Sequence, residues 1–324
     1  MNQVRPLRWH DLPLVYRLIG HGASFDAQFS LTVGDDGLRH SLLSNSGNTH
    51  SFVMRQGGGA FGLLRSLPDT QSAGLSYLAP GLDQGGREEQ WLALIGGMSV
   101  IAGQRGIVAI RAEAGDDTPE FAVLREAEFG VYAHQSLWER PAGPAEGGTS
   151  LLEAASADEV SGLMGMIDAR SPSLLRQITL PPGNEAECYV LGTRRASGMV
   201  AVYRGAGRVL ADLYLSIEAH EKAPDMVTSL LAIAGAEANT VICRVRHDME
   251  WIGRHLAEAG FDWSGSQAIL VRHTMAHIRR HTVMELPAKR GMIPNASHIV
   301  RGEPPQRRPD PARPASHERT HQPV

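Results

Sequence analysis

Short runs of apolar and β-branched residues alternate along this chain with longer stretches that have the periodicity of a helix. In the first half, residues 51–55 and 60–65 are two such runs joined by the glycines at 57–59, a pattern typical of a hairpin. Residues 73–78 form a further strand-like run, and residues 88–104 are predicted to be a helix. The pattern therefore predicts a group of antiparallel strands followed by a helix.

The second half of the chain shows the same order of elements. Residues 188–193 and 198–203 correspond to the hairpin, residues 209–216 to the next strand, and residues 224–237 to the helix. The predicted order in each half is β-α-β-β-β-α-β-α-β. This is an α+β, or mixed α/β, pattern with a mixed and mostly antiparallel sheet flanked by helices.

A short sequence repeat links the two halves. The segment Leu-Arg-Glu-Ala-Glu-Phe at residues 124–129 returns as Leu-Ala-Glu-Ala-Gly-Phe at residues 256–261. A glutamine follows each phenylalanine at the same distance, as Gln135 and Gln267, so the copies are offset by about 132 residues. A repeat with this period predicts two similar domains rather than a solenoid of short units.

Composition along the chain places the domain boundaries. Residues 1–140 and 149–283 are predicted to be the two domains, joined by a linker at 141–148 that is rich in proline and glycine. Residues 284–324 hold many prolines and arginines and no aromatic residue. Such a segment buries too little apolar area to offset its ordering entropy, so we expect a disordered tail.

The composition also limits the class of protein and of partner. The 324 residues are 42% hydrophobic and 20% charged, which is ordinary for a soluble globular chain. A net charge of −4 argues against a nucleic-acid or anionic-membrane partner. Residues 1–14 lack the apolar core of a signal peptide, and the apolar run at 91–103 is too short to cross a bilayer. We therefore expect a cytoplasmic protein with no membrane contact; its oligomeric state is left open.

Motifs that would indicate other chemistry are missing or weak. There is no G-x-S-x-G, P-loop or G-x-G-x-x-G sequence, so hydrolase, P-loop and dinucleotide-binding functions lack support. His273, His277 and His281 are spaced by four residues, but arginines stand among them and oppose a cation, so we predict no metal site. Arg244 and Arg246 follow the second copy of the repeated strand, where they could line a cleft.

The element order, together with the repeated helix–[Glu/Gly]-Phe–strand unit, resembles the GCN5-related N-acetyltransferase (GNAT) superfamily in two tandem copies. The resemblance covers about 280 residues and implies two tandem GNAT-like domains. In that family the fourth and fifth strands separate, and acyl-CoA lies in the gap. Its pyrophosphate rests on a [Gln/Arg]-x-x-Gly-x-[Gly/Ala] loop that opens the next helix, where backbone N–H groups and the helix dipole attract anions.

Both copies depart from this loop pattern. In the first copy two acidic residues, Glu88 and Glu89, open the helix and oppose a bound anion. The second copy has no glycine in its loop, and Pro224 lacks an N–H at the helix start. The resemblance implies as cofactor-binding candidates Gln84, Gly85, Gly86 and Arg87 in the first copy and Lys222 in the second. We expect acyl-CoA at the first copy, if it binds.

The catalytic groups that the resemblance implies are also incomplete. The family often uses as general acid a tyrosine five residues before the repeated phenylalanine, and those positions are Leu124 and Leu256 here. A general base is often a carboxylate on or after the fourth strand. The second copy offers Asp212 and Glu218 there, with Tyr214 nearby, and these three are the catalytic candidates.

The resemblance implies transfer of an acyl group, and first of all acetyl from acetyl-CoA, to an amine of a small molecule or peptide. The alternative is a catalytically silent GNAT-like protein that binds a ligand or a partner. The lost tyrosines and altered loops favour the silent protein, whereas the intact element order fits both functions.

Overall fold

The computed structural model of the chain describes residues 4–31, 48–67, 71–141, 150–170, 181–183, 185–192, 197–234 and 239–274, and all statements below concern these residues. The predicted tail at 284–324 lies outside them, and so does the predicted linker except Pro141, which is the last residue of a strand.

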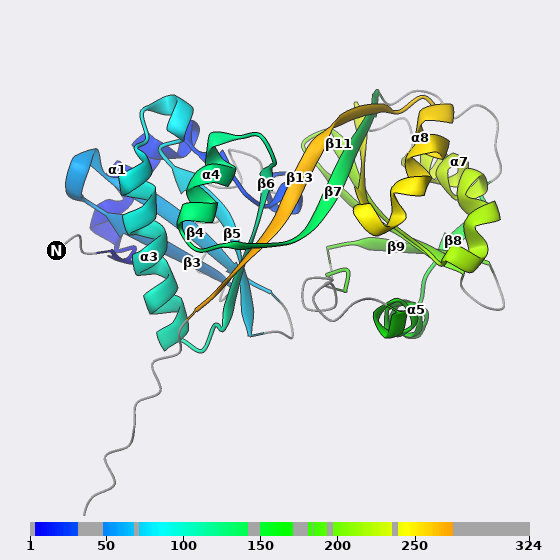
Figure 1. Cartoon of the computed structure of the whole chain (residues 1–324), viewed down its shortest axis with the longest axis horizontal. Coiled ribbons are helices and arrows are strands. Elements are labelled where there is room, and N and C mark those ends of the chain that lie inside the picture. Colours follow the sequence, from blue (N-terminus) through cyan, green and yellow to red (C-terminus); the bar gives the residue numbers. More distant parts are fainter. Residues whose placement is uncertain are drawn as a thin grey trace, which may run out of the picture. The chain divides into compact units, whose positions relative to one another are not determined.

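The described residues of the first half form strands β1 to β7 and the helices α1, α3 and α4, several of which are labelled in Figure 1. The strands are β1 (Arg5–Pro6), β2 (Ala23–Ser24), β3 (Thr49–Met54), β4 (Ala60–Ser66), β5 (Ser72–Ala79), β6 (Ala109–Gly115) and β7 (Gly130–Pro141). The helices are α1 (Leu12–Leu18), α3 (Glu88–Gln104) and α4 (Pro119–Glu126), with short 3-10 turns η1 (Trp9–Asp11), η2 (Ile19–His21), η3 (Gln56–Gly58) and η4 (Leu82–Gln84).

The second half repeats this order. Its described strands are β8 (Leu152–Ala154), β9 (Glu187–Leu191), β10 (Gly198–Gly205), β11 (Arg208–Leu215), β12 (Thr240–Arg246) and β13 (Asp262–His273). Its helices are α5 (Ala157–Arg170), α7 (Ala223–Ala234) and α8 (Gly253–Glu258), with 3-10 segments η5 (Ile217–Lys222) and η6 (His247–Ile252).

The elements form where their local sequence favours them. The predicted hairpin is β3–β4, and the glycines of its turn have φ values of 70°, 97° and 94° at Gly57, Gly58 and Gly59, which side chains with a Cβ rarely adopt. The predicted helix at 88–104 is α3. Helix α4 begins after Thr118, whose hydroxyl accepts a hydrogen bond from the Phe121 N–H. Local propensity and tertiary structure therefore agree in these segments.

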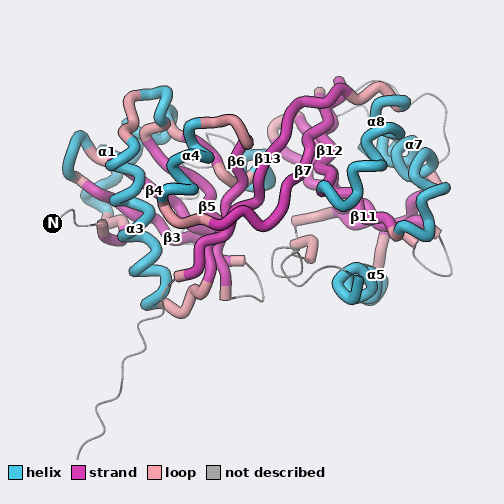
Figure 2. The backbone as a smooth tube through the Cα atoms, in the orientation of Figure 1, coloured by secondary structure: helices cyan, strands magenta, loops and turns pink. Residues whose placement is uncertain are grey.

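All the described strands belong to one mixed and mostly antiparallel sheet (Figure 2). Its order is β1-β3-β4-β5-β6-β13-β7-β12-β11-β10-β9-β8, with β2 paired to β5. Parallel pairing occurs only between β5 and β6 and between β11 and β12 among the described strands. From one edge the strands run β1-β3-β4-β5-β6-β13, and from the other edge the corresponding strands of the second half run β8-β9-β10-β11-β12-β7. The fold therefore consists of two tandem copies.

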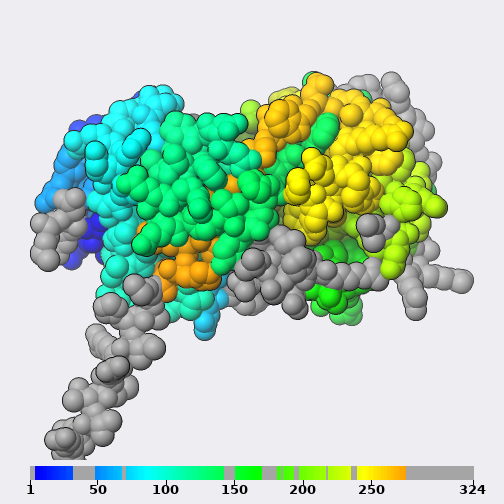
Figure 3. Space-filling view, in the orientation of Figure 1, coloured from blue at the N-terminus to red at the C-terminus, as the bar shows by residue number. Residues whose placement is uncertain are grey.

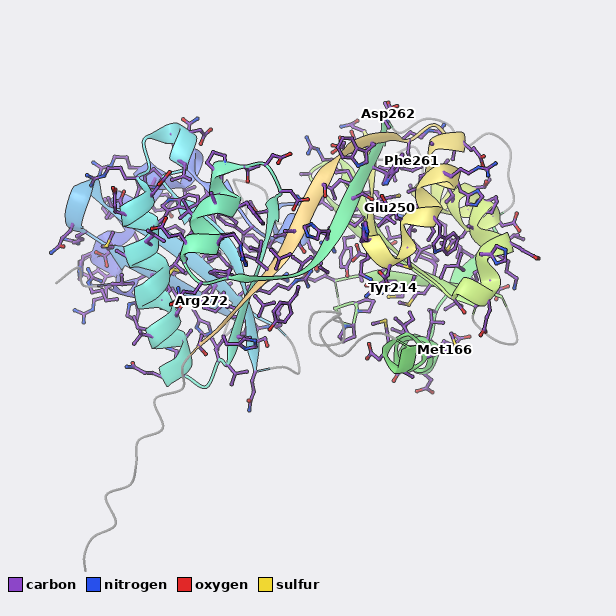
Figure 4. All side chains as sticks on the ribbon, viewed as in Figure 1. Met166, Tyr214, Glu250, Phe261, Asp262 and Arg272 are labelled. Atoms are coloured by element: carbon purple, nitrogen blue, oxygen red, sulfur yellow. The ribbon has the colours of Figure 1, made fainter. Side chains whose placement is uncertain are left out.

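The last strand of each half crosses into the other half. β13 lies between β6 and β7, and β7 lies between β13 and β12. In Figure 4, Phe261 and Asp262 lie beside α8, whereas Arg272 of the same strand lies in the first half, where it donates a 2.7 Å hydrogen bond to the Ala127 carbonyl oxygen. The orange surface of β13 likewise emerges among the cyan and green surface of the first half in Figure 3.

Each half has an apolar core on both faces of the sheet. One face packs against α3 and α4 in the first half and against α7 and α8 in the second. Residues of α1 pack on the opposite face of the first half, and those of α5 on the opposite face of the second. Leu124 and Leu256, where the family often has tyrosine, are fully buried in the cores of α4 and α8.

Candidate functional site

Two strands of the first half separate along their length. β5 and β6 pair only as far as Gly74 and Arg111, although β5 continues to Ala79 and β6 to Gly115. A register shift in the β4–β5 pairing leaves Ser76 as an extra residue of β5, and such a bulge bends its strand. The two strands therefore form a fork.

The chain itself fills this first fork. β2 pairs with the part of β5 that has left β6. The next residue, Phe25, donates its N–H to the Ser76 carbonyl oxygen at 3.1 Å, and its own carbonyl oxygen accepts the Glu113 N–H at 2.9 Å. The Phe25 ring is 2% exposed and packs edge to face on Trp91, 5.5 Å between centroids. Residues 23–25, which we call the plug, thus take up the hydrogen-bonding edges of both strands.

The second half has an equivalent fork. β11 and β12 pair as far as Asp212 and Arg244, and β11 then continues to Leu215 and β12 to Arg246. The β10–β11 register is continuous, without the bulge of the first half. No described strand enters this second fork, and residues 171–180, which follow α5 as the plug follows α1 and η2, lie outside the described residues.

A cavity of about 310 Å³ opens onto both forks. The last paired residues of each fork belong to its wall, and so do Phe25 of the plug and residues of β4 and β10, the two outer strands beside the forks. Its lining includes Phe25, Asp26, Arg65, Gly74, Arg111 and Glu113 of the first half and Glu185, Tyr203, Asp212, Leu213, Tyr214, Arg244 and Arg246 of the second, with Gln135 and Ile269 of the two exchanged strands.

A chain of ion pairs crosses the cavity from one half to the other. Arg111 contacts Glu113 at 2.8 Å, Glu113 contacts Arg244 at 3.1 Å, and Arg244 holds both oxygens of Asp212 at 2.6 Å. β6 and β12 are three strand spacings apart, about 14 Å, so the side chains must converge above the β13–β7 pair. We call these four residues the ionic ladder.

The centre of the ladder lies at equivalent positions of the two copies. Glu113 is opposite Ile269 in the β6–β13 pairing, and Arg244 is opposite Leu137 in the β12–β7 pairing. Leu137 and Ile269 have the same offset as the repeated glutamines. One structural position therefore carries a glutamate in one copy and an arginine in the other, which lets the two copies attract each other where identical charges would repel.

Burial makes this pair of charges interdependent. The Arg244 side chain is 11% exposed and that of Glu113 is 7% exposed. Burial alone would lower the pKa of Arg244, but the carboxylates of Asp212 and Glu113 raise it above its ordinary value. The guanidinium is therefore charged at every pH at which the protein folds. Its charge stabilises the ionised form of both buried carboxylates, Asp212 and Glu113.

Two tyrosines stand at the second-half end of the cavity. Tyr203 and Tyr214 are both buried, and burial followed by the charge of Asp212 raises the pKa of each hydroxyl above its ordinary value. Both hydroxyls are therefore protonated at neutral pH. Neither has a hydrogen-bond partner among the described residues, so each remains able to donate and accept.

The predicted catalytic residues are only partly brought together. Asp212 and Tyr214 line the cavity at the second fork, and Tyr214 is labelled in Figure 4. Asp212 is ion-paired, because Arg244 donates one hydrogen bond to each of its oxygens. Glu218 is exposed in η5, outside the lining of the cavity. Their catalytic roles stay predictions.

The predicted phosphate loop of the first half uses its own amides. Gln84 ends η4, and Gly85 has a φ of 90° that a glycine adopts readily. The N–H groups of Gln84 and Gly86 both donate to the Gly81 carbonyl oxygen, at 2.9 and 2.8 Å. Two of the amides expected to meet a phosphate therefore close the loop on itself.

The two candidate cations are both exposed, and each has one hydrogen bond to the described residues. The Arg87 guanidinium donates to the Gly57 carbonyl oxygen of the β3–β4 turn at 3.0 Å. The Lys222 ammonium donates to the Ser197 hydroxyl at 3.3 Å.

The described residues also bear on metal binding and on membrane insertion. They contain no group of three or more His, Cys, Asp or Glu side chains that could hold a metal ion. No described helix is long and apolar enough to cross a membrane. His273 lies on β13 with its ring nitrogen 2.5 Å from the Tyr132 hydroxyl, whereas His277 and His281 lie outside the described residues.

Sequence reasoning missed the first-half side of the cavity. Asp26, Arg65 and Glu113 were not among the candidates. A signal was present in residues 110–114, where charged and apolar residues alternate with the period of a strand and so indicate one polar face. Nothing in the sequence indicates that this face meets its counterpart from β12.

Comparison with known proteins identifies the fold. A GCN5-related N-acetyltransferase from Sphaerobacter thermophilus matches with a TM-score of 0.51 and 14% identity, over 84% of this chain and 95% of that one. A putative acetyltransferase from Pyrococcus horikoshii matches with a TM-score of 0.51 and 11% identity, over 84% and 89% of the two chains. No family model and no curated protein sequence match the chain.

The chain therefore has an acyltransferase-like fold, that of the GCN5-related N-acetyltransferases. It contains this fold in two tandem copies, as the repeat predicted, with their last strands exchanged.

Proposed function

We propose that the chain is an acyl-CoA-dependent N-acyltransferase that uses the second fork as its donor site and the central cavity as its acceptor site. The observation that carries this proposal is that the chain fills its own first fork. Both forks open onto one cavity, but the plug takes up the strand edges of the first, and Asp212 and Tyr214 line the cavity at the second. The donor would be acetyl-CoA, and the acceptor an amine of a small molecule or peptide.

The reaction would take place where the second fork meets the cavity. Backbone N–H groups of β11 beyond Asp212, which have lost β12 as a neighbour, would bind the thioester oxygen. The amine nitrogen attacks the thioester carbonyl carbon, a C–N bond forms, and the C–S bond breaks. The amine proton ends on the sulfur, so the products are an amide and free CoA.

Side chains of the second half would place the amine for this attack. Asp212 carries the negative charge nearest the fork, and Arg244 fixes its orientation through both oxygens. We assign Asp212 to holding the amino group, and Tyr214 to donating or accepting a hydrogen bond there. Glu218, exposed in the loop after β11, would act only as a proton acceptor through water.

The pyrophosphate of the donor would lie at the start of α7, against Lys222. This departs from the sequence-based expectation, which placed CoA at Gln84, Gly85, Gly86 and Arg87. The closed loop and the plug of the first half argue for the change. A CoA-dependent reaction also fits the cytoplasmic location expected from the sequence, and it needs no metal.

Isothermal titration of acetyl-CoA and of free CoA tests the proposal. Lys222→Glu should weaken binding about tenfold or more, because a charge-assisted contact contributes about 1.5–3 kcal/mol. Arg87→Glu is the matched control and should change it little. No binding to the unmutated protein at millimolar ligand rules the acyltransferase out. Loss with Arg87→Glu alone would place the donor in the first half.

A second candidate function is supported by the same site. Asp212 is already neutralised by Arg244, and one of the two forks is closed, as expected for a GNAT-like protein that binds a ligand without transferring an acyl group. This candidate predicts that CoA fails to bind while a small molecule still binds the cavity.

A further inference from the structure

The central cavity has two polar ends of different character. We infer that it binds a small amino acid or short peptide, that is, a molecule with both a free amino group and a free carboxylate. This inference rests on the proposed function in taking the cavity for the acceptor site, and it names the class of acceptor. Binding itself can be measured without CoA.

The first-half end offers an unused donor to a carboxylate. Arg65 lines the cavity, and its two terminal guanidinium nitrogens contact Asp26 at 2.7 Å and Glu185 at 3.8 Å. Its Nε is buried and has no hydrogen-bond partner. A buried N–H without a partner is costly, and a carboxylate bound beside Arg65 would accept from it.

The second-half end suits an amino group. Asp212 supplies negative charge, and each of its oxygens accepts a single hydrogen bond, so lone pairs remain. The hydroxyls of Tyr203 and Tyr214 lack partners among the described residues and can accept from an ammonium. This end lies at the second fork, where the proposed function needs the nucleophilic nitrogen.

The centre of the cavity offers no charge to a ligand. Glu113 already accepts from Arg111 and Arg244 and from the Ala27 N–H at 3.4 Å. It is therefore saturated and serves to hold the two halves together. A ligand must find its contacts at the two ends.

The balance of charge decides between ligand classes. Among the described residues, the lining contains four arginines and four carboxylates, so the formal charge of these residues is zero. A ligand with one charge alone would leave an uncompensated charge in a partly buried site, whereas a zwitterion leaves none. These eight residues are Arg65, Arg111, Arg244, Arg246, Asp26, Glu113, Glu185 and Asp212.

The volume limits the size of the ligand. At about 310 Å³ the cavity is at the lower end of the range for small-molecule sites. An amino acid or a dipeptide fits that range, whereas a folded protein segment does not. The separation of the two ends selects among zwitterions of different length.

The test is isothermal titration of the full chain, without CoA, against matched probes. L-Alanine, 4-aminobutyrate and glycylglycine carry both groups at increasing separation, whereas n-butylamine and n-butyrate carry one each. We expect at least one zwitterion to bind tenfold or more tightly than either single-charge probe. If no zwitterion exceeds butylamine and butyrate at millimolar concentration, the inference is wrong.

Two substitutions assign the ends. Arg65→Lys keeps a charge beside Asp26 but removes the Nε donor, so zwitterion binding should fall tenfold while n-butylamine binding is unchanged. Tyr203→Phe should weaken the binding of the zwitterion and the binding of n-butylamine by a similar factor. Arg254→Lys, at an exposed arginine of α8, is the control and should have no effect. An unchanged zwitterion affinity in both cavity variants would overturn the inference.

The outcome stays separate from that of the proposed function. Zwitterion binding without any CoA binding would support this inference and favour the silent ligand-binding protein. CoA binding without zwitterion binding would keep the acyltransferase and refute this class of acceptor.

Discussion

Gln135 and Gln267 lie directly opposite each other in the β7–β13 pair, and the Gln135 side-chain amide donates to the Gln267 side-chain oxygen at 3.1 Å. They are 132 residues apart and occupy equivalent places in the two copies. The approximate two-fold axis of the fold therefore passes between them. A contact of a residue with its own counterpart is expected of a symmetric dimer, and here it occurs within one chain.

This contact predicts a response to paired substitutions. The double variant Gln135→Glu/Gln267→Glu places two carboxylates opposite each other in a partly buried pair, so the Tm at neutral pH should fall by several degrees. It should recover at pH 4–5 as one carboxyl takes up a proton. The Gln135→Leu/Gln267→Leu variant, which removes both polar groups, is the control and should be nearly neutral. Equal loss in both variants, independent of pH, would contradict the explanation by charge.

The exchanged strands predict the behaviour of a cut chain. If the chain is expressed as residues 1–141 and 150–278, the two pieces should co-elute as one complex, because each supplies a central strand to the other. A piece alone would expose unpaired strand edges, which favour association. Gel filtration with light scattering measures this. Two separate, folded monomers would contradict the exchange of β7 and β13.

The ionic ladder predicts a large loss on removing its centre. Arg244→Ala leaves Asp212 as a buried carboxylate without its cation and Glu113 with Arg111 alone, and breaking a buried pair costs about 3–5 kcal/mol. Arg254→Ala breaks an exposed pair on α8 and should cost no more than about 0.5 kcal/mol. Urea denaturation compares the two. A similar small loss for both would show that the ladder is open to solvent.

Asp11 predicts a pH dependence of stability. Its buried carboxylate accepts from Arg5 at 2.6 and 2.8 Å, from the Arg8 N–H at 3.0 Å and from Arg55 at 2.9 Å. The hydrogen bonds from Arg5 lower the pKa of this carboxyl well below its ordinary value, although burial opposes them. A lowered folded pKa adds stability above the unfolded pKa of about 4, and this is lost as pH falls toward the folded pKa.

Asp11→Asn should therefore cost about 1.5–3 kcal/mol at pH 7 and progressively less as the pH falls from 4 to 2. Thermal melts across that range measure the difference from the unmutated protein. A difference that stays constant over the whole range would mean that the ion pair does not supply this stability.

The sequence allowed the elements and their repetition to be predicted because both depend on local pattern. The helix at 88–104 has continuous helical periodicity, and the hairpin at 51–65 has its glycines at the turn. Two features could not be predicted. The apolar pattern of β13 would be the same whichever strand lay beside it. The local sequence therefore does not indicate that β13 pairs with β6 of the first half. The plug contains a strand of two residues, too short for any period.

The candidate site likewise contains some residues that the local sequence predicted and others that it did not. Asp212 and Tyr214 were predicted from their strand and do line the cavity. Glu113 of β6 meets Arg244 of β12 only because these two strands lie on either side of the exchanged pair β13–β7. The neutralisation of Asp212 by Arg244 depends on the parallel β11–β12 register, which no residue spacing indicates.

With the proposed function, the placement of both forks on one cavity predicts how many ligands the molecule binds. Two copies of a fold would be expected to serve two reaction centres if their forks opened on separate surfaces. Here donors in both forks would reach the same acceptor in the cavity. A second donor site would therefore compete with the first for that acceptor and would not double the rate of product formation. Closing one fork with the chain's own residues 23–25 then leaves no idle centre, and a tandem chain of this kind should saturate at one ligand per molecule.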